Sequence, residues 1–167
     1  MRRPGELEKV SCLVIPGGES TTLTRLVDRA GLREPLGDFA AHHPVMGTCA
    51  GLIMLAAALT GEERPDYGVE PLGLLDCTVI RNGYGRQIDS FTAPISLDRL
   101  DGSQDPFPAV FIRAPRITSL GPDVEVLASY GDEPVIIRQG HLVGMAFHPE
   151  LTEDYRIHRF FLDLLPG

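Results

Sequence analysis

Apolar runs of strand length alternate with helix-like stretches along the first 60 residues. Residues 10–15 (VSCLVI) are apolar at both alternating sets of positions, as in a strand covered on both faces, and Pro16-Gly17-Gly18 ends the run. The elements predicted for this half are, in chain order, a strand at 10–15, helices at 20–30 and 34–41, a strand at 45–47 and a helix at 52–59. Strands and helices that alternate in this way predict a parallel sheet with helices packed on it.

The rest of the chain is mostly strand-like, with glycine and proline turns between the runs. Six strands are predicted, at 74–80, 87–96, 109–113, 124–130, 134–139 and 142–147. The last three are close enough in the chain to be antiparallel neighbours. A final helix is predicted from Thr152, a good N-cap, with Glu153 and Asp154 in its first turn. The predicted fold is therefore α/β, with an antiparallel extension.

The predicted helices differ in how their apolar positions are placed. Residues 52–59 are apolar nearly all round, which predicts a deeply buried helix. The helix at 20–30 is ended by Gly31. Its apolar face is formed by Leu23, Leu26 and Val27, and that of the final helix by Ile157, Phe160, Phe161 and Leu164.

Length and charge narrow the classes of protein. The 167 residues are most simply one domain, and the net charge of −8, without a long acidic block, argues against nucleic acid or an anionic membrane as the main partner. No apolar run approaches the roughly 20 residues of a membrane helix, and the N-terminus lacks the apolar stretch of a signal peptide. Three cysteines without a close-spaced pair indicate reduced thiols in a cytoplasm, and predict neither a disulfide framework nor a metal site.

One cysteine stands in a pattern typical of a nucleophile. Gly47-Thr48-Cys49-Ala50-Gly51 lies between a predicted strand and a predicted helix, as does the G-x-S-x-G elbow of serine hydrolases. A helix N-terminus at Ala50 would favour the thiolate of Cys49 over the thiol. By contrast, Cys12 and Cys77 lie inside apolar strand runs, where a core position is the simpler interpretation.

A thiolate nucleophile needs a base, and the base needs a group that orients it. Of the five histidines, His148 ends a predicted strand and is followed by Pro149 and Glu150. Proline keeps the preceding residue extended, and positions i and i+2 of an extended chain point to the same side. His148 and Glu150 can therefore lie side by side, and with Cys49 they form a complete Cys-His-Glu set.

The turn after the first predicted strand supplies candidate oxyanion donors. The backbone N–H groups of Gly17 and Gly18 can turn toward a developing oxyanion, together with that of Ala50. The turn lacks the glycine spacing and the lysine of a phosphate-binding loop. Read alone, it is also compatible with a plain strand-to-helix turn capped by Ser20.

Together, PGGEST (16–21), GTCAG (47–51) and FHPELTED (147–154) resemble the class I glutamine amidotransferases. More narrowly, RNGYGRQIDSF (81–91) and VFIRAP (110–115) make the chain similar to the glutaminase subunits of pyridoxal 5'-phosphate synthase. The resemblance implies a flavodoxin-like, three-layer fold with a mostly parallel sheet and helices on both faces. It also implies hydrolysis of the side-chain amide of L-glutamine through a thioester, without a cofactor, and delivery of the ammonia to the synthase (lyase) subunit of a hetero-oligomeric complex.

The resemblance also implies a role for each matching residue. It makes Cys49 the nucleophile and His148 with Glu150 its relay. The implied ligands of glutamine are Gly18, Glu19, Ser20, Arg81, Ile112 and Arg113. Guanidinium groups suit the substrate carboxylate, and Glu19 or a backbone carbonyl suits its ammonium group.

Three other functions stay open at this point. The same elbow could serve a cysteine peptidase or related hydrolase, or a glutaminase of another synthase. A catalytically impaired binding subunit is the third, because the family's usual first strand and helix have no counterpart in this sequence. From that difference we expect Met1 to be an internal start, with a segment of roughly 30 residues upstream, the size of a strand-plus-helix crossover.

Overall fold

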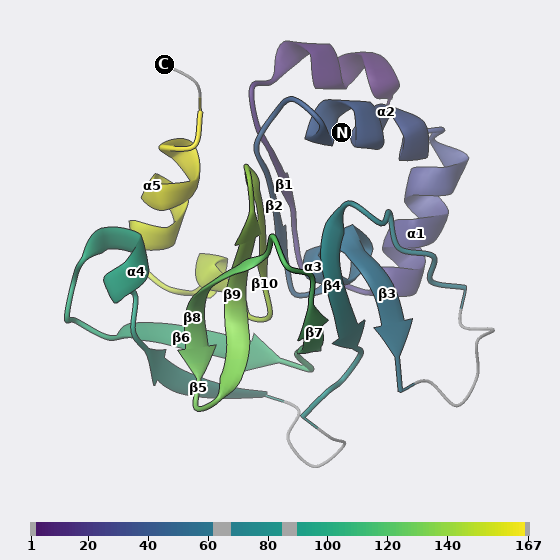
Figure 1. Ribbon diagram of the computed structural model, residues 1–167. Coiled ribbons are helices and arrows are strands. Elements are labelled where there is room, and N and C mark those ends of the chain that lie inside the picture. The colour runs from purple at the N-terminus through teal and green to yellow at the C-terminus, as the bar shows by residue number, and fades with distance from the viewer. Residues whose placement is uncertain (1–2, 62–67, 85–89, 166–167) are drawn as a thin grey trace.

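A five-stranded sheet forms the centre of the protein (Figure 1). The computed structural model describes residues 3–61, 68–84 and 90–165. The strands of this sheet, in spatial order, are β1 (Leu13–Ile15), β2 (Val45–Thr48), β10 (Leu142–Met145), β9 (Glu133–Gln139) and β8 (Glu125–Tyr130). Both β1 and β10 run parallel to β2, whereas β9 is antiparallel to β10 and to β8. The parallel part of the sheet thus joins segments from the two ends of the chain.

Two smaller sheets complete the strands. One contains β3 (Ala56–Thr60), β4 (Leu75–Ile80) and β7 (Arg116–Leu120), and the other contains β5 (Ser90–Ile95) and β6 (Phe107–Ile112). The predicted α/β fold is confirmed: β1-β2-β10 and β3-β4 are parallel, and β9 and β8 form an antiparallel extension of the central sheet. Parallel neighbours need long crossovers, and the short turns of the second half permit only antiparallel pairs. Residues 87–89 of the predicted strand 87–96 lie outside the described residues.

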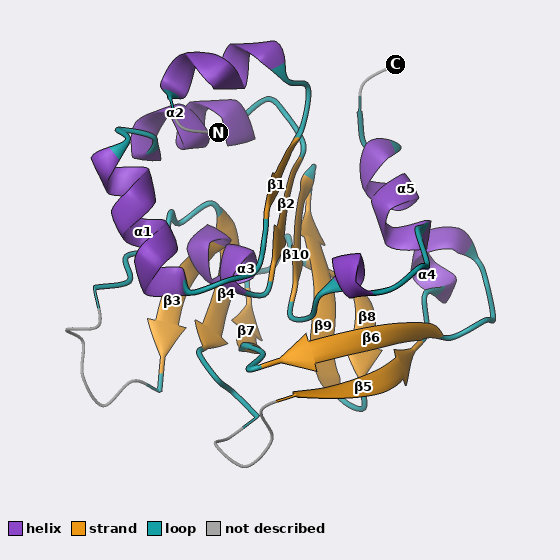
Figure 2. Cartoon of the chain, turned by 180° about the vertical axis from the view of Figure 1, so that it is seen from behind, coloured by secondary structure: helices purple, strands orange, loops and turns teal. Residues whose placement is uncertain are grey.

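Helices lie on both sides of the central sheet, as predicted. One side carries α1 (Ser20–Arg29), α2 (Arg33–Ala40) and α3 (Ala50–Leu55), and the other carries α4 (Asp98–Asp101) and α5 (Arg156–Leu162) (Figure 2). Short 3-10 turns occur at Pro4–Lys9 and Pro149–Leu151. The middle of β9, residues 135–137, is fully buried, as expected for a strand covered on both faces. No helix among the described residues is long and apolar enough to cross a membrane.

The predicted helix 52–59 is wrong in its second half. The helix α3 ends at Leu55, and the chain turns extended at Ala56 to become β3. The backbone N–H groups of Leu72 and Leu74 bind the carbonyls of Met54 and Leu55, so the next helical turn has no free acceptors there. Pairing of β3 with β4 thus outweighs the helix propensity of the alanine run.

The face that α1 buries also differs from the prediction. Leu26 is 56% exposed, whereas Ser20 and Thr24 are buried. The Thr24 hydroxyl donates to the sulfur of Met54 at 3.3 Å, so the helix packs on α3 through small polar side chains. Small residues allow the two helices to approach closely, and this places the start of α1 next to the cavity described below.

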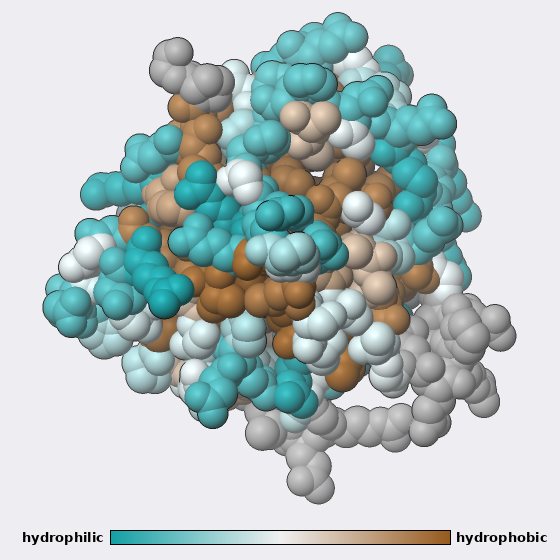
Figure 3. All heavy atoms as spheres, viewed as in Figure 1, coloured by the Kyte–Doolittle hydropathy of each residue, from teal (hydrophilic) through white to brown (hydrophobic). Residues whose placement is uncertain are grey.

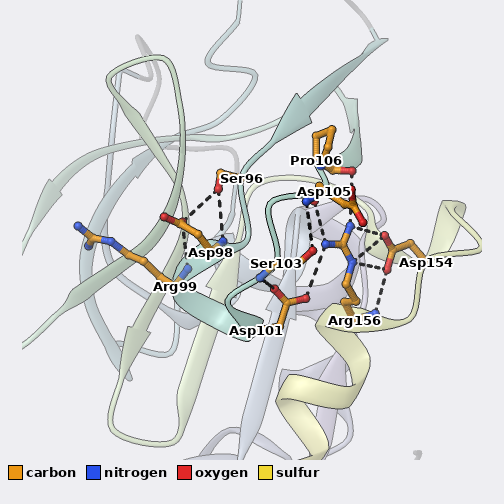
Figure 4. Close-up of polar contacts among 9 residues, drawn as sticks. All are labelled: Ser96, Asp98, Arg99, Asp101, Ser103, Asp105, Pro106, Asp154 and Arg156. Atoms are coloured by element: carbon orange, nitrogen blue, oxygen red, sulfur yellow. Dashed lines mark hydrogen bonds and ion pairs between the residues drawn. The ribbon is translucent and has the colours of Figure 1, made fainter.

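The final helix begins later than predicted, at Arg156, and Thr152 is not its N-cap. The Thr152 hydroxyl shapes the preceding turn instead, accepting from the Asp154 N–H and donating to the Pro149 carbonyl. Arg156 then ties the helix start to the segment before β6, with its guanidinium on both Asp154 oxygens and on the carbonyl of Asp105 (Figure 4). These tertiary contacts decide where the helix begins. The predicted apolar face is confirmed by the buried Ile157 and Phe161.

Figure 3, drawn in the view of Figure 1, shows apolar residues at the surface in the middle of this face.

The edge of the central sheet at β1 is partly open. Within the described chain, β1 pairs on one side only, with β2, and its Val14 side chain is 44% exposed. The predicted strand is also shorter than expected, because Val10 to Cys12 lie outside it. The central sheet therefore ends in a short, partly open edge at β1.

Candidate active site

The turn between β2 and α3 holds Cys49 in an uncommon backbone conformation. Its φ of 50° and ψ of −105° lie where few residues other than glycine are found, and its N–H donates to the Met145 carbonyl at 2.9 Å. A Cβ on Gly47 would lie 2.6 Å from the backbone of Gly51, and one on Gly51 would collide with the Ile15 carbonyl. Both glycines of the motif are therefore required by close backbone approaches, as in a nucleophile elbow.

The expected preference for the thiolate is wrong for this structure. Burial raises the pKa of Cys49 to about 11, and it outweighs the hydrogen bond from the Ala50 N–H and the charge of Arg113, which both lower it. The helix that follows has only six residues, so its dipole is small. The Cys49 sulfur is 3.7 Å from the Ile112 carbonyl, which fits a protonated thiol that donates. A base must therefore remove this proton before Cys49 can attack.

Such a base and its orienting group lie side by side at the end of β10. The Nδ1 atom of His148 is 2.7 Å from Glu150 Oε1, as the i, i+2 spacing predicts. With Nδ1–H donating to the carboxylate, Nε2 is left as the proton acceptor. The His148 side chain is only 12% exposed, its backbone N–H donates to the Val110 carbonyl, and Gly17 packs directly against its ring. The backbone of His148 is thus held by Val110, and its ring by Glu150 and Gly17.

These groups meet in one cavity of about 160 Å³. Its lining residues are Gly18, Glu19, Ser20, Cys49, Ala50, Ile53, Arg81, Asn82, Ile112, Arg113 and His148. Of the predicted site residues, Gly17 and Glu150 are not in the lining, since both lie against the His148 ring instead. The volume is below the roughly 300–1,000 Å³ of drug-sized pockets, so it fits a small substrate such as an amino acid.

Backbone strain is concentrated at this cavity. Among the described residues, positive φ outside glycine occurs at Cys49, Asn82 and Arg113, and all three line it. Such conformations cost about 1–3 kcal/mol each and persist where surrounding contacts enforce them, most often at functional sites. Asn82 and Ile53 were not among the predicted site residues. The Asn-Gly pair at 82–83 is a turn signal that could have identified the first of them.

Glu19 lines the cavity from the N-cap position of α1. Its carboxylate caps α1, accepting from the N–H groups of Thr21 at 3.0 Å and Thr22 at 2.7 Å. Burial is the largest single effect and raises its pKa, but the hydrogen bonds from Thr21 and Thr22 together outweigh it and lower the pKa to about 2. An oxygen of the same carboxylate is 3.7 Å from the guanidinium of Arg81. Glu19 therefore anchors both the helix start and one arginine of the cavity.

The cavity lies where the parallel strands end. Gly18 follows β1, Cys49 follows β2 and His148 follows β10, and these three strands are parallel neighbours. In open α/β sheets, ligands bind in the crevice outside the carboxyl ends of such strands. A cysteine at a strained turn, beside a carboxylate-oriented histidine, is the arrangement of a thiol-dependent hydrolase or transferase. Among the described residues, no group of three or more His, Cys, Asp or Glu side chains is arranged to hold a metal ion.

The chain belongs to the SNO glutamine amidotransferase family, whose family model matches residues 1–165. The resemblance seen in the motifs is thereby confirmed. The relatives include the pyridoxal 5'-phosphate synthase subunit PdxT of Deinococcus radiodurans, which is 53% identical over 98% of this chain and 83% of its own. The subunit of the same name from Geobacillus kaustophilus is 50% identical over 99% of this chain and 81% of its own. A crystal structure of a glutamine amidotransferase matches with a TM-score of 0.89 at 42% identity, over 98% of this chain and 84% of that one.

Proposed function

We propose that this protein hydrolyses the side-chain amide of L-glutamine and supplies the ammonia to a pyridoxal 5'-phosphate synthase subunit. One observation carries the proposal. Cys49, in its strained turn, shares a small cavity with His148, whose Nδ1 atom is hydrogen-bonded to Glu150. Membership of the glutamine amidotransferase family and the names of the relatives support the substrate and the partner.

In the first half of the reaction, His148 Nε2 accepts the proton of the Cys49 thiol as the sulfur attacks the side-chain carbonyl carbon of glutamine. The oxyanion that forms accepts hydrogen bonds from the N–H groups of Gly18 and Ala50, which line the cavity. The intermediate collapses when the imidazolium returns its proton to the amide nitrogen. Ammonia leaves, and a γ-glutamyl thioester with Cys49 remains.

In the second half, a water molecule loses a proton to His148 and adds to the thioester carbonyl. The carbon–sulfur bond then breaks, glutamate forms, and the proton passes from the imidazolium back to Cys49. Glu150 stabilises the imidazolium in both halves and holds its tautomer, without taking the proton itself. Because burial keeps Cys49 protonated at neutral pH, His148 must accept the thiol proton as the sulfur attacks the substrate.

The rest of the cavity recognises the amino acid part of the substrate. Arg81 and Arg113 offer guanidinium groups to the carboxylate of glutamine, and the Ile112 carbonyl is an acceptor for its ammonium group. Gly18, Glu19 and Ser20 also line the cavity, and Glu19 forms an ion pair with Arg81. Release of ammonia toward the synthase subunit in a hetero-oligomeric complex, in a reducing cytoplasm, completes the proposal; the free thiols of all three cysteines are compatible with that compartment.

The test is ammonia release from glutamine, with and without the synthase subunit. Cys49→Ala is expected to abolish it and to leave the far-UV spectrum and partner binding unchanged, whereas the matched variant Cys12→Ala keeps full activity. An electrophilic glutamine analogue should label Cys49 and spare Cys77. Clear glutaminase activity in Cys49→Ala would refute the assignment.

The same assay separates the competing functions. Turnover of peptides in preference to free glutamine would indicate a peptidase. A rate that responds to a different synthase, and not to the pyridoxal 5'-phosphate synthase subunit, would identify another complex. A wild-type protein that binds glutamine and the partner, but releases no ammonia in their presence, would be a binding subunit.

A further inference from the structure

Three side chains outside the cavity form a polar network behind its wall. The guanidinium of Arg116, at the start of β7, is 2.6 Å from Glu133 Oε1, at the start of β9. Burial raises the pKa of Tyr84 to about 12, and the negative charge and the hydrogen bond of the same Glu133 carboxylate act in the same direction. The Tyr84 ring packs edge-on against Phe91 and Phe111, with centroids 5.5 and 5.9 Å away. The network therefore joins β7, β9 and the turn that follows β4.

That turn and the end of β6 supply the arginines of the cavity. Arg81 and Asn82 belong to the turn, and Arg113 follows β6. A backbone hydrogen bond from the N–H of Gly83 to the carbonyl of Ala114, at 2.9 Å, joins the two segments. Two of the three strained residues, Asn82 and Arg113, thus lie next to the two ends of this bond.

Arg116 of this network also packs against the turn, at Gly83. A Cβ on Gly83 would lie 2.7 Å from the backbone nitrogen of Arg116 and closer still to its side chain, so the turn rests directly on this arginine. Tyr84, the next residue, is held by its hydroxyl and by its ring. Strained conformations persist only where the surroundings over-determine them, and Arg116, Glu133 and Tyr84 provide that constraint here.

We propose that Tyr84, Glu133 and Arg116 are positioning residues for substrate recognition: they hold the turn at 81–84 against residues 112–114, so that Arg81 and Arg113 face the carboxylate of the substrate together. The inference rests on the proposed function for the identity of that substrate. It separates these three residues from the chemistry, because none of them lines the cavity or contacts Cys49 or His148 in the described structure.

The experiment measures glutamine hydrolysis by the complex with the synthase subunit for Glu133→Gln and Tyr84→Phe. Glu125→Gln is the control, because it makes the same charge change at an exposed position of β8. We expect KM for glutamine to rise about tenfold in Glu133→Gln, the factor for one lost hydrogen bond to a charged group, while kcat stays within about twofold. Tyr84→Phe keeps the ring packing, and we expect a rise of about threefold. In Cys49→Ala variants, which bind without turnover, Kd for glutamine should rise by the same factors.

Two results would overturn the inference. One is an unchanged KM and Kd with a lower unfolding midpoint, which would make the network purely structural. The other is a fall in kcat at constant KM, which would make it part of the chemistry. Absence of glutaminase activity in the wild-type complex would count against the proposed function instead. The Kd measurements for glutamine would still decide the role of the network.

Discussion

Gly17 offers a direct test of whether the position of His148 controls the reaction. A Cβ at residue 17 would lie 2.9 Å from Nδ1 of His148 and closer still to Cε1. Ordinary contacts of this kind begin near 3.4 Å, so the ring must move by at least 0.5 Å judged from Nδ1, and further at Cε1. The ring cannot move far without stretching its 2.7 Å hydrogen bond to Glu150. A misplacement approaching 1 Å costs about 100-fold in rate, which we expect as the loss of kcat in Gly17→Ala.

The assay is steady-state ammonia release, with thermal unfolding measured on the same preparations. Gly37→Ala is the matched control, because no atom lies within 4 Å of the added Cβ in the middle of α2. It should keep wild-type kcat and gain about 0.5–1 kcal/mol in unfolding free energy. In a His148→Ala background, Gly17→Ala should cost nothing further, since the two changes act on one group. Wild-type kcat in Gly17→Ala, or full additivity in the double variant, would refute the reasoning.

His148→Ala should lower kcat by roughly 100- to 10,000-fold, and Glu150→Gln by less, since it disturbs orientation but removes no proton carrier; a larger loss in Glu150→Gln would reverse the assigned roles. The rate at which iodoacetamide alkylates Cys49 in the free subunit, followed by peptide mass spectrometry, should increase with pH up to about 11. A rate that levels off near pH 7 would contradict the raised pKa of the buried thiol. Because the pKa of Glu19 is lowered to about 2 from 4.5, its hydrogen bonds stabilise the fold above pH 4.5 and are lost as the pH falls toward 2. The unfolding free energy of the wild type should therefore exceed that of Glu19→Gln at pH 7, by a margin that shrinks over this range; a constant margin would exclude the cap.

Local patterns predicted two geometric features of the candidate site. The glycines around Cys49 must permit a tight turn, and this requirement is visible in five consecutive residues. The pairing of His148 with Glu150 follows from the geometry of two residues in an extended chain. In both cases the physical cause lies within the motif itself, so no knowledge of the tertiary structure was needed.

Features that depend on distant neighbours were not predictable in this way. Burial in the folded protein raises the pKa of Cys49, which reverses the expectation from its helix N-terminus. The alanine run after Leu55 becomes a strand because segment 72–74 takes the acceptors of the helix. Strand β7 (Arg116–Leu120) was missed altogether, since its burial pattern is only partly alternating and its pairing with β4 is interrupted by a bulge.

Residues that follow strands of three separate sheets line the cavity, so the proposed reacting groups and the arginines are carried by different sheets. Cys49 and His148 follow strands of the five-stranded sheet, Arg81 follows β4, and Arg113 follows the β5–β6 hairpin. The side chains of the two arginine-bearing turns can therefore be substituted without rebuilding the strands that carry the sulfur and the imidazole, whereas β6 itself contacts His148 and Cys49 through the carbonyls of Val110 and Ile112. A scaffold of this kind can evolve a new acyl substrate while it retains its chemistry. For protein engineering, libraries confined to the arginine-bearing turns are the natural route to altered amide specificity.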